Sequence, residues 1–227
     1  MKFVFLHVGS DFRPGLLVRS IRRTLPSAEI VQCTNHMDSR IEGVDDVFIL
    51  EDDVSNLMTY RLKAFSLLGL TTPAIYLDTD ILITRPFAID QLLKDQDLAV
   101  CKRTFGSDAL INTTFKGMDL SEYQNKTFGE VYPYLASFNI TRTHSFWTAC
   151  HEKLLNLDRK FHFWYGDQEA MREVIKTRRF TLTELAESQI SCLPEYVNPA
   201  NMPLAVHFKG PNRKHLMQDA ARHLQLA

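Results

Sequence analysis

Short apolar runs alternate with helical spacings through the first hundred residues of this chain, and that alternation limits the folds open to it. The runs at 3–8, 30–34, 47–50, 74–77 and 98–101 are typical of strands, and the segments 16–25, 55–70 and 89–93 are typical of helices. Pro26 and Pro73 close two of these helices, and Ser55 is suited to cap the second. Such alternation predicts an α/β fold with a mainly parallel central sheet flanked by helices on both faces.

The second half of the chain is less regular. Residues 105–131 are polar and weakly periodic, which is typical of a long loop. Beyond it we expect strands at 134–140 and 204–208, and helices at 146–157, 167–176 and 213–226, the last of them basic and amphipathic. With 227 residues and 45% hydrophobic composition, the chain is long enough for one domain, 1–227, with a sizeable core.

Charge and cysteine usage exclude several classes of protein. The formal net charge of −1 argues against a general nucleic-acid binder. The four cysteines, at 33, 101, 150 and 192, lack the short spacings of zinc or redox sites, so we interpret them as buried thiols of a reducing compartment. The apolar start is too short for a signal peptide, and no stretch reaches the length of a membrane span. We therefore expect a soluble, cytoplasmic protein.

Two aspartates follow the apolar run at 74–77. Asp78 and Asp80 are separated only by Thr79, at the carboxyl end of an expected strand. Ligands of open α/β sheets collect at this edge, and two neighbouring carboxylates ionise together most readily when a cation joins them. The motif predicts a Mg²⁺-type site that bridges to a phosphate substrate. The alternative is a turn whose acids only cap a helix.

Arg61 lies at the centre of the apolar face of the expected helix 55–70. A guanidinium keeps its proton, so on a core-facing stripe it needs an anionic or carbonyl partner. That partner is either a ligand or a structural aspartate, unless the side chain reaches past the helix edge to solvent.

Two later motifs carry polar groups suited to a nucleotide sugar. In "HFKGPNRKH" (207–215), His207 could complete a metal site, Gly210 permits close approach of the backbone, and Lys209 and Arg213 add positive charge. The alternative is a solvated basic turn. In "WYGDQEAM" (164–171), Asp167 is suited to cap a helix, and Gln168 can donate to and accept from sugar hydroxyls.

The order of these motifs resembles the GT-A fold glycosyltransferases, most closely the retaining enzymes of family 8. The likeness covers nearly the whole chain, through "YRLKAF", "YLDTDILI", "GDQEA" and "HFKGPNRK". It implies a nucleotide-binding half, 1–103, and a sugar and acceptor half, 104–227. It also implies a UDP-sugar donor and Mn²⁺ or Mg²⁺ as cofactor. The acceptor would be a saccharide or glycolipid, held in the second case by peripheral contact of the basic last helix with a membrane.

The resemblance also implies roles for individual residues. Asp78, Asp80 and His207 would hold the metal, Arg61 would contact the donor, and Asp167 and Gln168 would face the transferred sugar. Gly210 and Arg213 would meet the leaving phosphates, and the nucleotide would contact Val8, Gly9, Asn35 and Thr79. The chain departs from the family where Lys209 replaces a small or apolar residue and Arg213 a lysine, and where "LASFNIT" replaces an expected "N-A-G" strand.

Two other functions remain compatible with the sequence. A non-catalytic sugar-nucleotide binder would keep the same ligand sites without turnover. A phosphatase of the haloacid dehalogenase type also ends a strand in D-x-D, but there the motif follows the first strand, whereas here three strands are expected before the strand that leads into Asp78.

Overall fold

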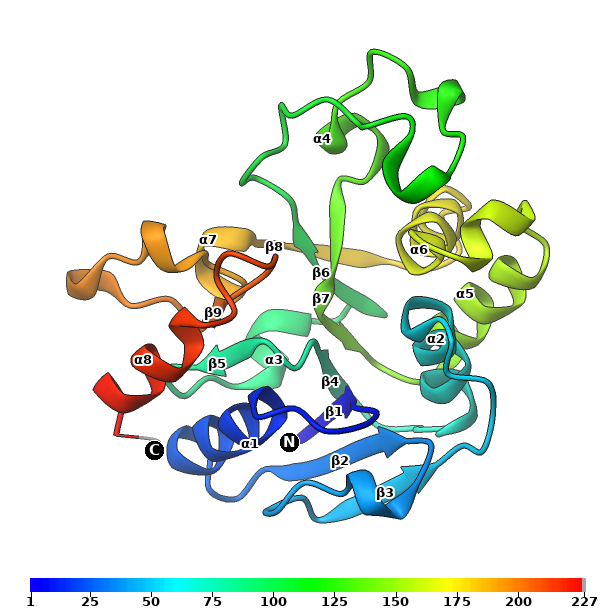
Figure 1. The fold of residues 1–227 in the computed structure, drawn as a ribbon. Coiled ribbons are helices and arrows are strands. Elements are labelled where there is room, and N and C mark those ends of the chain that lie inside the picture. The colour runs from blue at the N-terminus through cyan, green and yellow to red at the C-terminus, as the bar shows by residue number, and fades with distance from the viewer. Residues whose placement is uncertain (226–227) are drawn as a thin grey trace.

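A seven-stranded sheet forms the centre of the protein in the computed structural model, which describes residues 1–225 (Figure 1). Its strand order is β3-β2-β1-β4-β7-β6-β8, and β7 runs antiparallel to both of its neighbours. The strands are β1 Lys2–Leu6, β2 Glu29–Thr34, β3 Asp46–Ile49, β4 Ala74–Leu77, β6 Leu98–Lys102, β7 Tyr134–Thr141 and β8 Leu182–Ala186. The expected α/β class, with a mixed and mainly parallel sheet, is confirmed.

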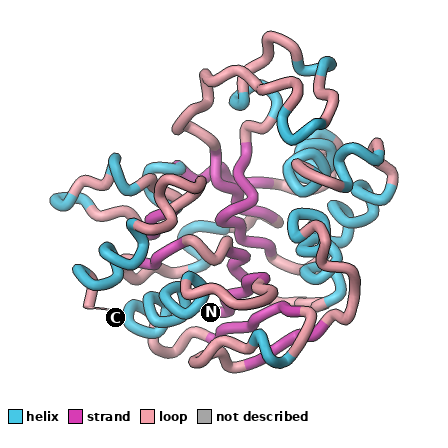
Figure 2. Tube along the Cα trace, viewed as in Figure 1, coloured by secondary structure: helices cyan, strands magenta, loops and turns pink. Residues whose placement is uncertain are grey.

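Helices cover both faces of this sheet, as Figure 2 shows. Alternate residues of β1 point to opposite sides: Phe3 and Phe5 join one core cluster, and Val4 joins the other. The first face is covered by α1 Arg13–Thr24 and α3 Ile89–Leu93. The second is covered by α2 Leu57–Leu67, α5 Ser145–Leu155 and α6 Gly166–Lys176.

A second, two-stranded sheet stands beside the first. It pairs β5 Ile81–Ile83 with β9 Ala205–His207, and α8 Leu216–His223 packs on it through buried Met217. The antiparallel register sets Ile81 opposite His207, and the Phe208 N–H donates to the Asp80 carbonyl at 2.8 Å. Residues far apart in the chain are thereby placed at one point.

Residues 103–133, hereafter the crown, form an irregular excursion between β6 and β7, at the top of Figure 1. The crown holds two 3₁₀ turns and the short helix α4 Phe128–Val131, and it packs around its own apolar cluster, which includes Leu120 and Tyr132. The expectation of a long, mostly irregular segment at 105–131 is therefore confirmed, although it contains these short helical turns. After β8, the short helix α7 Glu187–Ile190 leads through further 3₁₀ turns to β9.

Apart from the short helices α4 and α7, which the sequence did not predict, the elements differ from expectation in four places. β5 and β8 were not expected as strands: β5 comes after the aspartates as a run of three apolar residues, and β8 carries Glu184 in a weakly alternating sequence. Ser55 was the wrong cap for α2, because the Asn56 side chain accepts from the Met58 N–H. Asp167 is not the cap of α6 either, since the helix begins one residue earlier, after Tyr165.

The remaining expected elements are present, with ends shifted by a few residues. The last expected helix, 213–226, is observed as α8, and its final position lies outside the described residues. Within residues 1–225, no helix has the length and apolar character needed to cross a bilayer.

Candidate active site

The acid pair lies at the carboxyl end of β4, a strand buried along its whole length. The Asp78 backbone N–H donates to the Ser137 carbonyl of β7 at 2.9 Å, which fixes the position where the strand ends. The Asp78 side chain is partly exposed, whereas Asp80 is 8% exposed. Burying a carboxylate is costly unless a cation or hydrogen-bond donors meet it, so Asp80 needs such partners.

His207 is one of those partners. Its Nε2 lies 3.2 Å from Asp80 Oδ1 and 3.9 Å from Asp78 Oδ2. One ligand atom from each of the three side chains falls within 4.8 Å of the others, a spacing that fits a single metal ion. Two carboxylate oxygens and an imidazole nitrogen suit Mg²⁺ or Mn²⁺, so these residues fit the expected cofactor.

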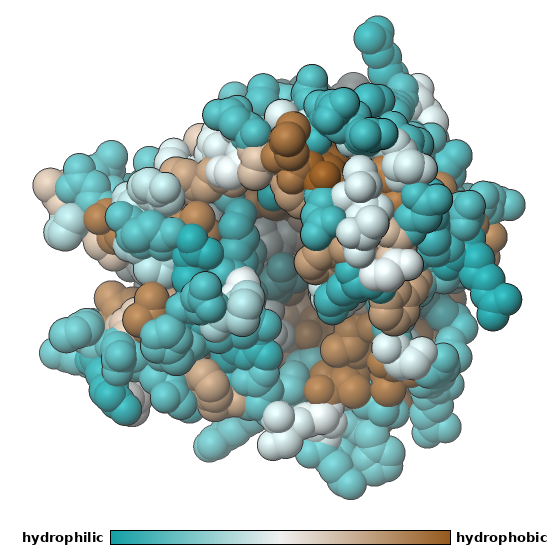
Figure 3. All heavy atoms as spheres, turned by 45° about the horizontal axis from the view of Figure 1, so that its top comes forward, coloured by the Kyte–Doolittle hydropathy of each residue, from teal (hydrophilic) through white to brown (hydrophobic). Residues whose placement is uncertain are grey.

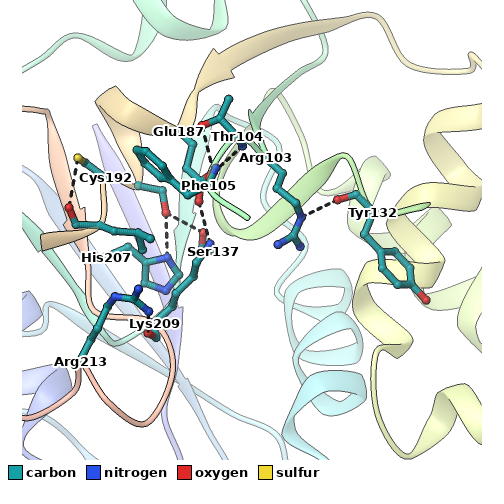
Figure 4. A network of polar contacts seen from close by, with 12 residues as sticks. Arg103, Thr104, Phe105, Tyr132, Ser137, Glu187, Cys192, His207, Lys209 and Arg213 are labelled. Atoms are coloured by element: carbon teal, nitrogen blue, oxygen red, sulfur yellow. Dashed lines mark hydrogen bonds and ion pairs between the residues drawn. The ribbon is translucent and has the colours of Figure 1, made fainter. Parts of the chain in front are cut away.

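A pair of buried serines holds the other side of the His207 ring. Ser191 Oγ lies 2.9 Å from His207 Nδ1 and 3.0 Å from Ser137 Oγ. Figure 4 shows Ser137 beside His207 in this network. A hydroxyl bound to Nδ1 fixes the ring orientation and keeps Nε2 turned toward the aspartates. The sequence motifs did not point to Ser191, which lies between α7 and β9.

The surroundings of Asp80 favour its ionised form. Burial acts to raise the pKa of this carboxyl, but His207, with smaller contributions from Lys214 and Arg13, lowers it to about 2. Arg13, at the start of α1, interacts with two carboxylates. Its Nη1 lies 3.9 Å from Asp80 Oδ2, and its Nε donates to Asp11 at 2.7 Å. These neighbours therefore keep Asp80 in its ionised form.

Arg61 joins Asp78 to Asp167. Its Nη1 donates to Asp78 Oδ1 at 2.5 Å, and its Nη2 donates to Asp167, which is almost fully buried. Burial raises the pKa of the Asp167 carboxyl, and Arg61 opposes that rise. Gly166 permits this packing, because a Cβ there would overlap the Phe161 carbonyl oxygen. We call Asp78, Asp80, His207, Arg61 and Asp167 the acid cluster.

Gln168, next to Asp167, turns its side chain toward β7. Its amide is satisfied when the oxygen accepts from the Ala136 N–H at 2.9 Å and the nitrogen donates to the Tyr134 carbonyl at 3.0 Å. Gln168 thus joins the first turn of α6 to the beginning of β7. Figure 3 shows the molecule hollowed at the centre of the face that lies below the crown.

The basic segment after β9 is tied down by carboxylates. Lys209 Nζ lies 2.8 Å from Glu187 Oε1, and Arg213 Nε lies 3.0 Å from the Glu195 carboxylate. Gly210 adopts φ +82°, a conformation that favours glycine, and this allows the tight turn between the two cations. The charges expected beside the leaving phosphates are near His207, but each has a protein partner.

Glu187 is a residue that sequence reasoning missed. Its carboxylate is fully buried and accepts from the backbone N–H groups of Thr104 at 2.6 Å and Phe105 at 2.8 Å, as well as from Lys209 (Figure 4). We call Glu187, Lys209 and these two N–H groups the anchor cluster. It fastens the base of the crown to the loop after His207, and neither its spacing nor its neighbours in sequence signalled that role.

The expected nucleotide contacts lie after β1 and β2. Val8 and Gly9 come after β1, and the His7 N–H just before them donates to the Cys33 carbonyl at 3.0 Å. Gly9 has φ +80° and donates its N–H to Ser39 Oγ at 3.2 Å. Asn35 comes directly after β2, and Thr79 is half-buried between the two aspartates. All four residues therefore lie at the carboxyl edge of the parallel strands.

Comparison with known proteins identifies the fold. No protein-family model matches the sequence, and no curated protein matches it. Solved structures do match: glycosyltransferase GlyE of Streptococcus pneumoniae TIGR4 has a TM-score of 0.66 at 14% identity, and its apo form has 0.64 at 15% identity. The galactosyltransferase LgtC, in complex with donor and acceptor sugar analogs, has a TM-score of 0.61 at 14% identity. This chain has the GT-A glycosyltransferase fold.

The extent of the match differs between these structures. The LgtC alignment covers 98% of this chain and 96% of that one, whereas the GlyE alignments cover 97% of this chain and 59% of that one. This chain thus spans about three-fifths of the GlyE chain. The resemblance found in the sequence motifs is confirmed at the level of the fold.

Proposed function

We propose that this protein is a metal-dependent glycosyltransferase that moves a hexose from a UDP-sugar to a hydroxyl group of a saccharide or glycolipid acceptor, with retention at the sugar carbon. The observation that carries the proposal is the meeting of Asp78, Asp80 and His207 at one point. They meet at the carboxyl edge of a mainly parallel sheet, where open α/β folds bind ligands. The fold is that of GlyE and LgtC.

Under this proposal, Asp78, Asp80 and His207 hold Mn²⁺ or Mg²⁺. Bound there, the cation would supply positive charge that stabilises a leaving diphosphate. Gly210 lets the backbone approach the phosphates, and Lys209 and Arg213, on either side of it, add positive charge. Val8, Gly9, Asn35 and Thr79 line the nucleotide at the ends of β1, β2 and β4.

The acid cluster supports retention over inversion. Inversion requires a carboxylate that can take a proton from the acceptor. Asp167, the first candidate for that base, is buried, bound to Arg61, and accepts from the Gln168 N–H at 2.7 Å. We assign it to orienting Arg61 and the transferred sugar. In a retaining reaction, an oxygen of the leaving phosphate takes the proton.

A nucleotide-binding assay with and without metal tests the proposal. In a thermal-shift titration with UDP and Mn²⁺, we expect stabilisation that requires both ligands, because a ligand that binds only the folded state raises the melting temperature. Asp80→Ala and His207→Ala should abolish that dependence. Asp38→Ala, which removes an exposed carboxylate outside the acid cluster, is the matched control. Equal shifts with and without Mn²⁺ would count against the metal site.

Turnover separates the proposal from its rivals. A transferase releases UDP slowly from a UDP-sugar without an acceptor, and faster with one. Metal-dependent UDP binding with no release would identify a non-catalytic binder. Hydrolysis of simple phosphate esters would favour the haloacid dehalogenase type, although the D-T-D motif comes after the fourth strand here and the fold is that of glycosyltransferases.

A further inference from the structure

Arg103 is a half-buried arginine at the carboxyl end of β6, the strand that runs in the same direction as β4. Its backbone N–H donates to the Pro133 carbonyl at 2.7 Å, and its Nε donates to the Tyr132 carbonyl at 2.8 Å. The guanidinium also lies over the Phe128 ring, 5.2 Å from the centroid. These contacts fix the stem of the side chain at the base of the crown and leave its two terminal nitrogens to be satisfied elsewhere.

No carboxylate satisfies them. Within residues 1–225, no carboxylate oxygen lies within 4.0 Å of the Arg103 guanidinium, whereas two other partly buried arginines, Arg61 and Arg172, are each ion-paired. Burial lowers the pKa of Arg103, opposed by the more distant charge of Glu187. That carboxylate is already taken by Lys209 and two backbone N–H groups. A cation that is partly removed from water without an anion is costly to keep.

The amide of Gln168 does not fill this gap. Arg103 Nη2 lies 3.4 Å from the Gln168 amide, at the limit of a hydrogen bond. In the amide orientation that satisfies Tyr134 and Ala136, the group facing Arg103 is the amide nitrogen, which donates and cannot accept. Among the described residues, Arg103 therefore presents two donor nitrogens without an acceptor.

Arg103 points toward residues to which the proposed function gives the sugar. In Figure 4, the guanidinium points away from Glu187, into the space between Lys209 and Tyr132. The Gln168 amide that it approaches is next to Asp167, which is bound through Arg61 to the metal ligand Asp78. The free donors thus lie beside the residue that follows Asp167, to which the proposed function gives the transferred sugar.

We propose that Arg103 binds a carboxylate carried by the substrate, so that the enzyme acts on a uronic acid. The inference rests on the proposed function for the place of the sugar. A planar guanidinium with two free N–H groups binds a carboxylate in bidentate fashion, with charge-assisted hydrogen bonds. A neutral hexose would supply only hydroxyl acceptors and leave the half-buried charge without an anion. The carboxylate belongs either to the donor sugar or to the acceptor.

Calorimetric titration of the full chain with Mn²⁺ present distinguishes these sources. The donor arm compares UDP, UDP-glucose and UDP-glucuronic acid. The acceptor arm compares glucose-ended with glucuronic-acid-ended disaccharides, with UDP bound. We expect one arm to show preference for the acidic ligand by at least about tenfold, since hydrogen bonds between charged groups contribute about 1.5–3 kcal/mol. Arg103→Met should remove the preference and leave UDP affinity unchanged.

Two variants control for charge and folding. Lys102→Met removes one positive charge from the adjacent, solvent-exposed position and should keep the preference. Arg103→Lys keeps the charge but not the fork, and should retain part of the preference, which covers the case in which Arg103→Met does not fold. The absence of any acid preference in both arms would overturn the inference, as would an equal loss of UDP affinity in Arg103→Met, which would assign Arg103 to the diphosphate.

Failure of the proposed function is a separate outcome. If wild-type protein binds no UDP, the transferase proposal fails. The anion site is then decided by the glucuronic-acid disaccharide alone: binding that is lost in Arg103→Met supports the site, and no binding overturns it.

Discussion

The acid cluster and the anchor cluster each bring several charged groups together near His207, but the balance of positive and negative charge differs between them. In the anchor cluster, one buried carboxylate is paired with one ammonium and accepts from two backbone N–H groups, so each charge has a partner within the protein. In the acid cluster, three carboxylates share Arg61 and His207, with Arg13 more distant and already bound to Asp11. The first arrangement pairs each charge within the protein and joins two segments of the fold, whereas the second has more carboxylates than nearby cationic side chains, an imbalance that the proposed metal would offset.

Removing the anchor carboxylate should produce the largest effect. Glu187→Ala leaves the Lys209 ammonium and the N–H groups of Thr104 and Phe105 without their acceptor. Breaking a buried ion pair at one partner costs about 3–5 kcal/mol. Urea unfolding should show this loss in the free energy of unfolding. Glu184→Ala, which breaks an exposed pair with Lys102, should cost less than about 1 kcal/mol. Equal losses in the two variants would contradict the structural role of the anchor cluster.

Adding Mn²⁺ should stabilise the protein through the acid cluster. At a Mn²⁺ concentration of about 100 times Kd, the free energy of unfolding should rise by about 2.7 kcal/mol. The gain should be absent in Asp80→Ala and present in Glu184→Ala. A wild-type protein that Mn²⁺ leaves unchanged in the urea titration would mean that Arg61, Arg13 and His207 already compensate the acids fully.

Loosening His207 should weaken the metal site without removing a ligand. Ser191→Ala deletes the hydroxyl that holds Nδ1, and loss of such an outer contact typically lowers metal affinity about 10–100-fold. Mn²⁺ titration calorimetry without nucleotide measures this change. Ser66→Ala removes another largely buried hydroxyl, the one bonded to Thr148, and should leave Mn²⁺ affinity unchanged. If both serine variants bind equally well, the ring is held by packing alone.

Acid should weaken the anchor cluster by a smaller amount. Burial acts to raise the pKa of Glu187, but Lys209 and the N–H groups of Thr104 and Phe105 outweigh it and hold the pKa below its usual 4.5. A depressed carboxyl pKa contributes stability that is complete above the unfolded-state value and is lost as the pH falls through the folded-state value.

The variant Glu187→Gln measures how much the charge of Glu187 contributes to stability. Glu187→Gln keeps an acceptor oxygen but no charge, so it should be less stable than wild type by about 1 kcal/mol at neutral pH, the difference between charged and neutral hydrogen bonds. The difference in unfolding free energy between the two proteins should shrink below pH 4.5. A difference that stays constant from neutral to acid pH would rule out an ionised Glu187.

The two clusters also differ in how many of their residues can be predicted from the sequence. Asp78 and Asp80 are predictable because their place directly after an apolar run puts them at the end of a strand. For Arg61, on an apolar helix face, the sequence predicts an anionic or carbonyl partner and leaves open whether it is a ligand or a structural aspartate. The partners are two aspartates, one of which, Asp167, the sequence favours as a helix cap. The spacing of residues within one element is encoded locally, so these predictions needed only short stretches of chain.

Glu187, Ser191 and Arg103 escaped prediction for a physical reason. Each acts through partners more than 15 positions away in the chain, from segments without regular period, and their pairing depends on how the crown and the loop after β8 are seated. Nothing in the residues around Glu187 distinguishes it from a solvated glutamate at the start of a short helix. Contacts of this kind become visible only once the tertiary arrangement is known.

The reversed direction of β7 has a consequence for how such proteins diversify. Because β6 ends and β7 begins at the same rim of the sheet, the crown departs and returns at nearly one place, as a hairpin loop would. An excursion with adjoining ends can be lengthened, trimmed or exchanged at little entropic cost and without disturbing the strands below it. Exchanging the outer part of the crown for that of a distant relative, while Arg103, Thr104 and Phe105 keep their places, is therefore a direct way to find out what the crown recognises.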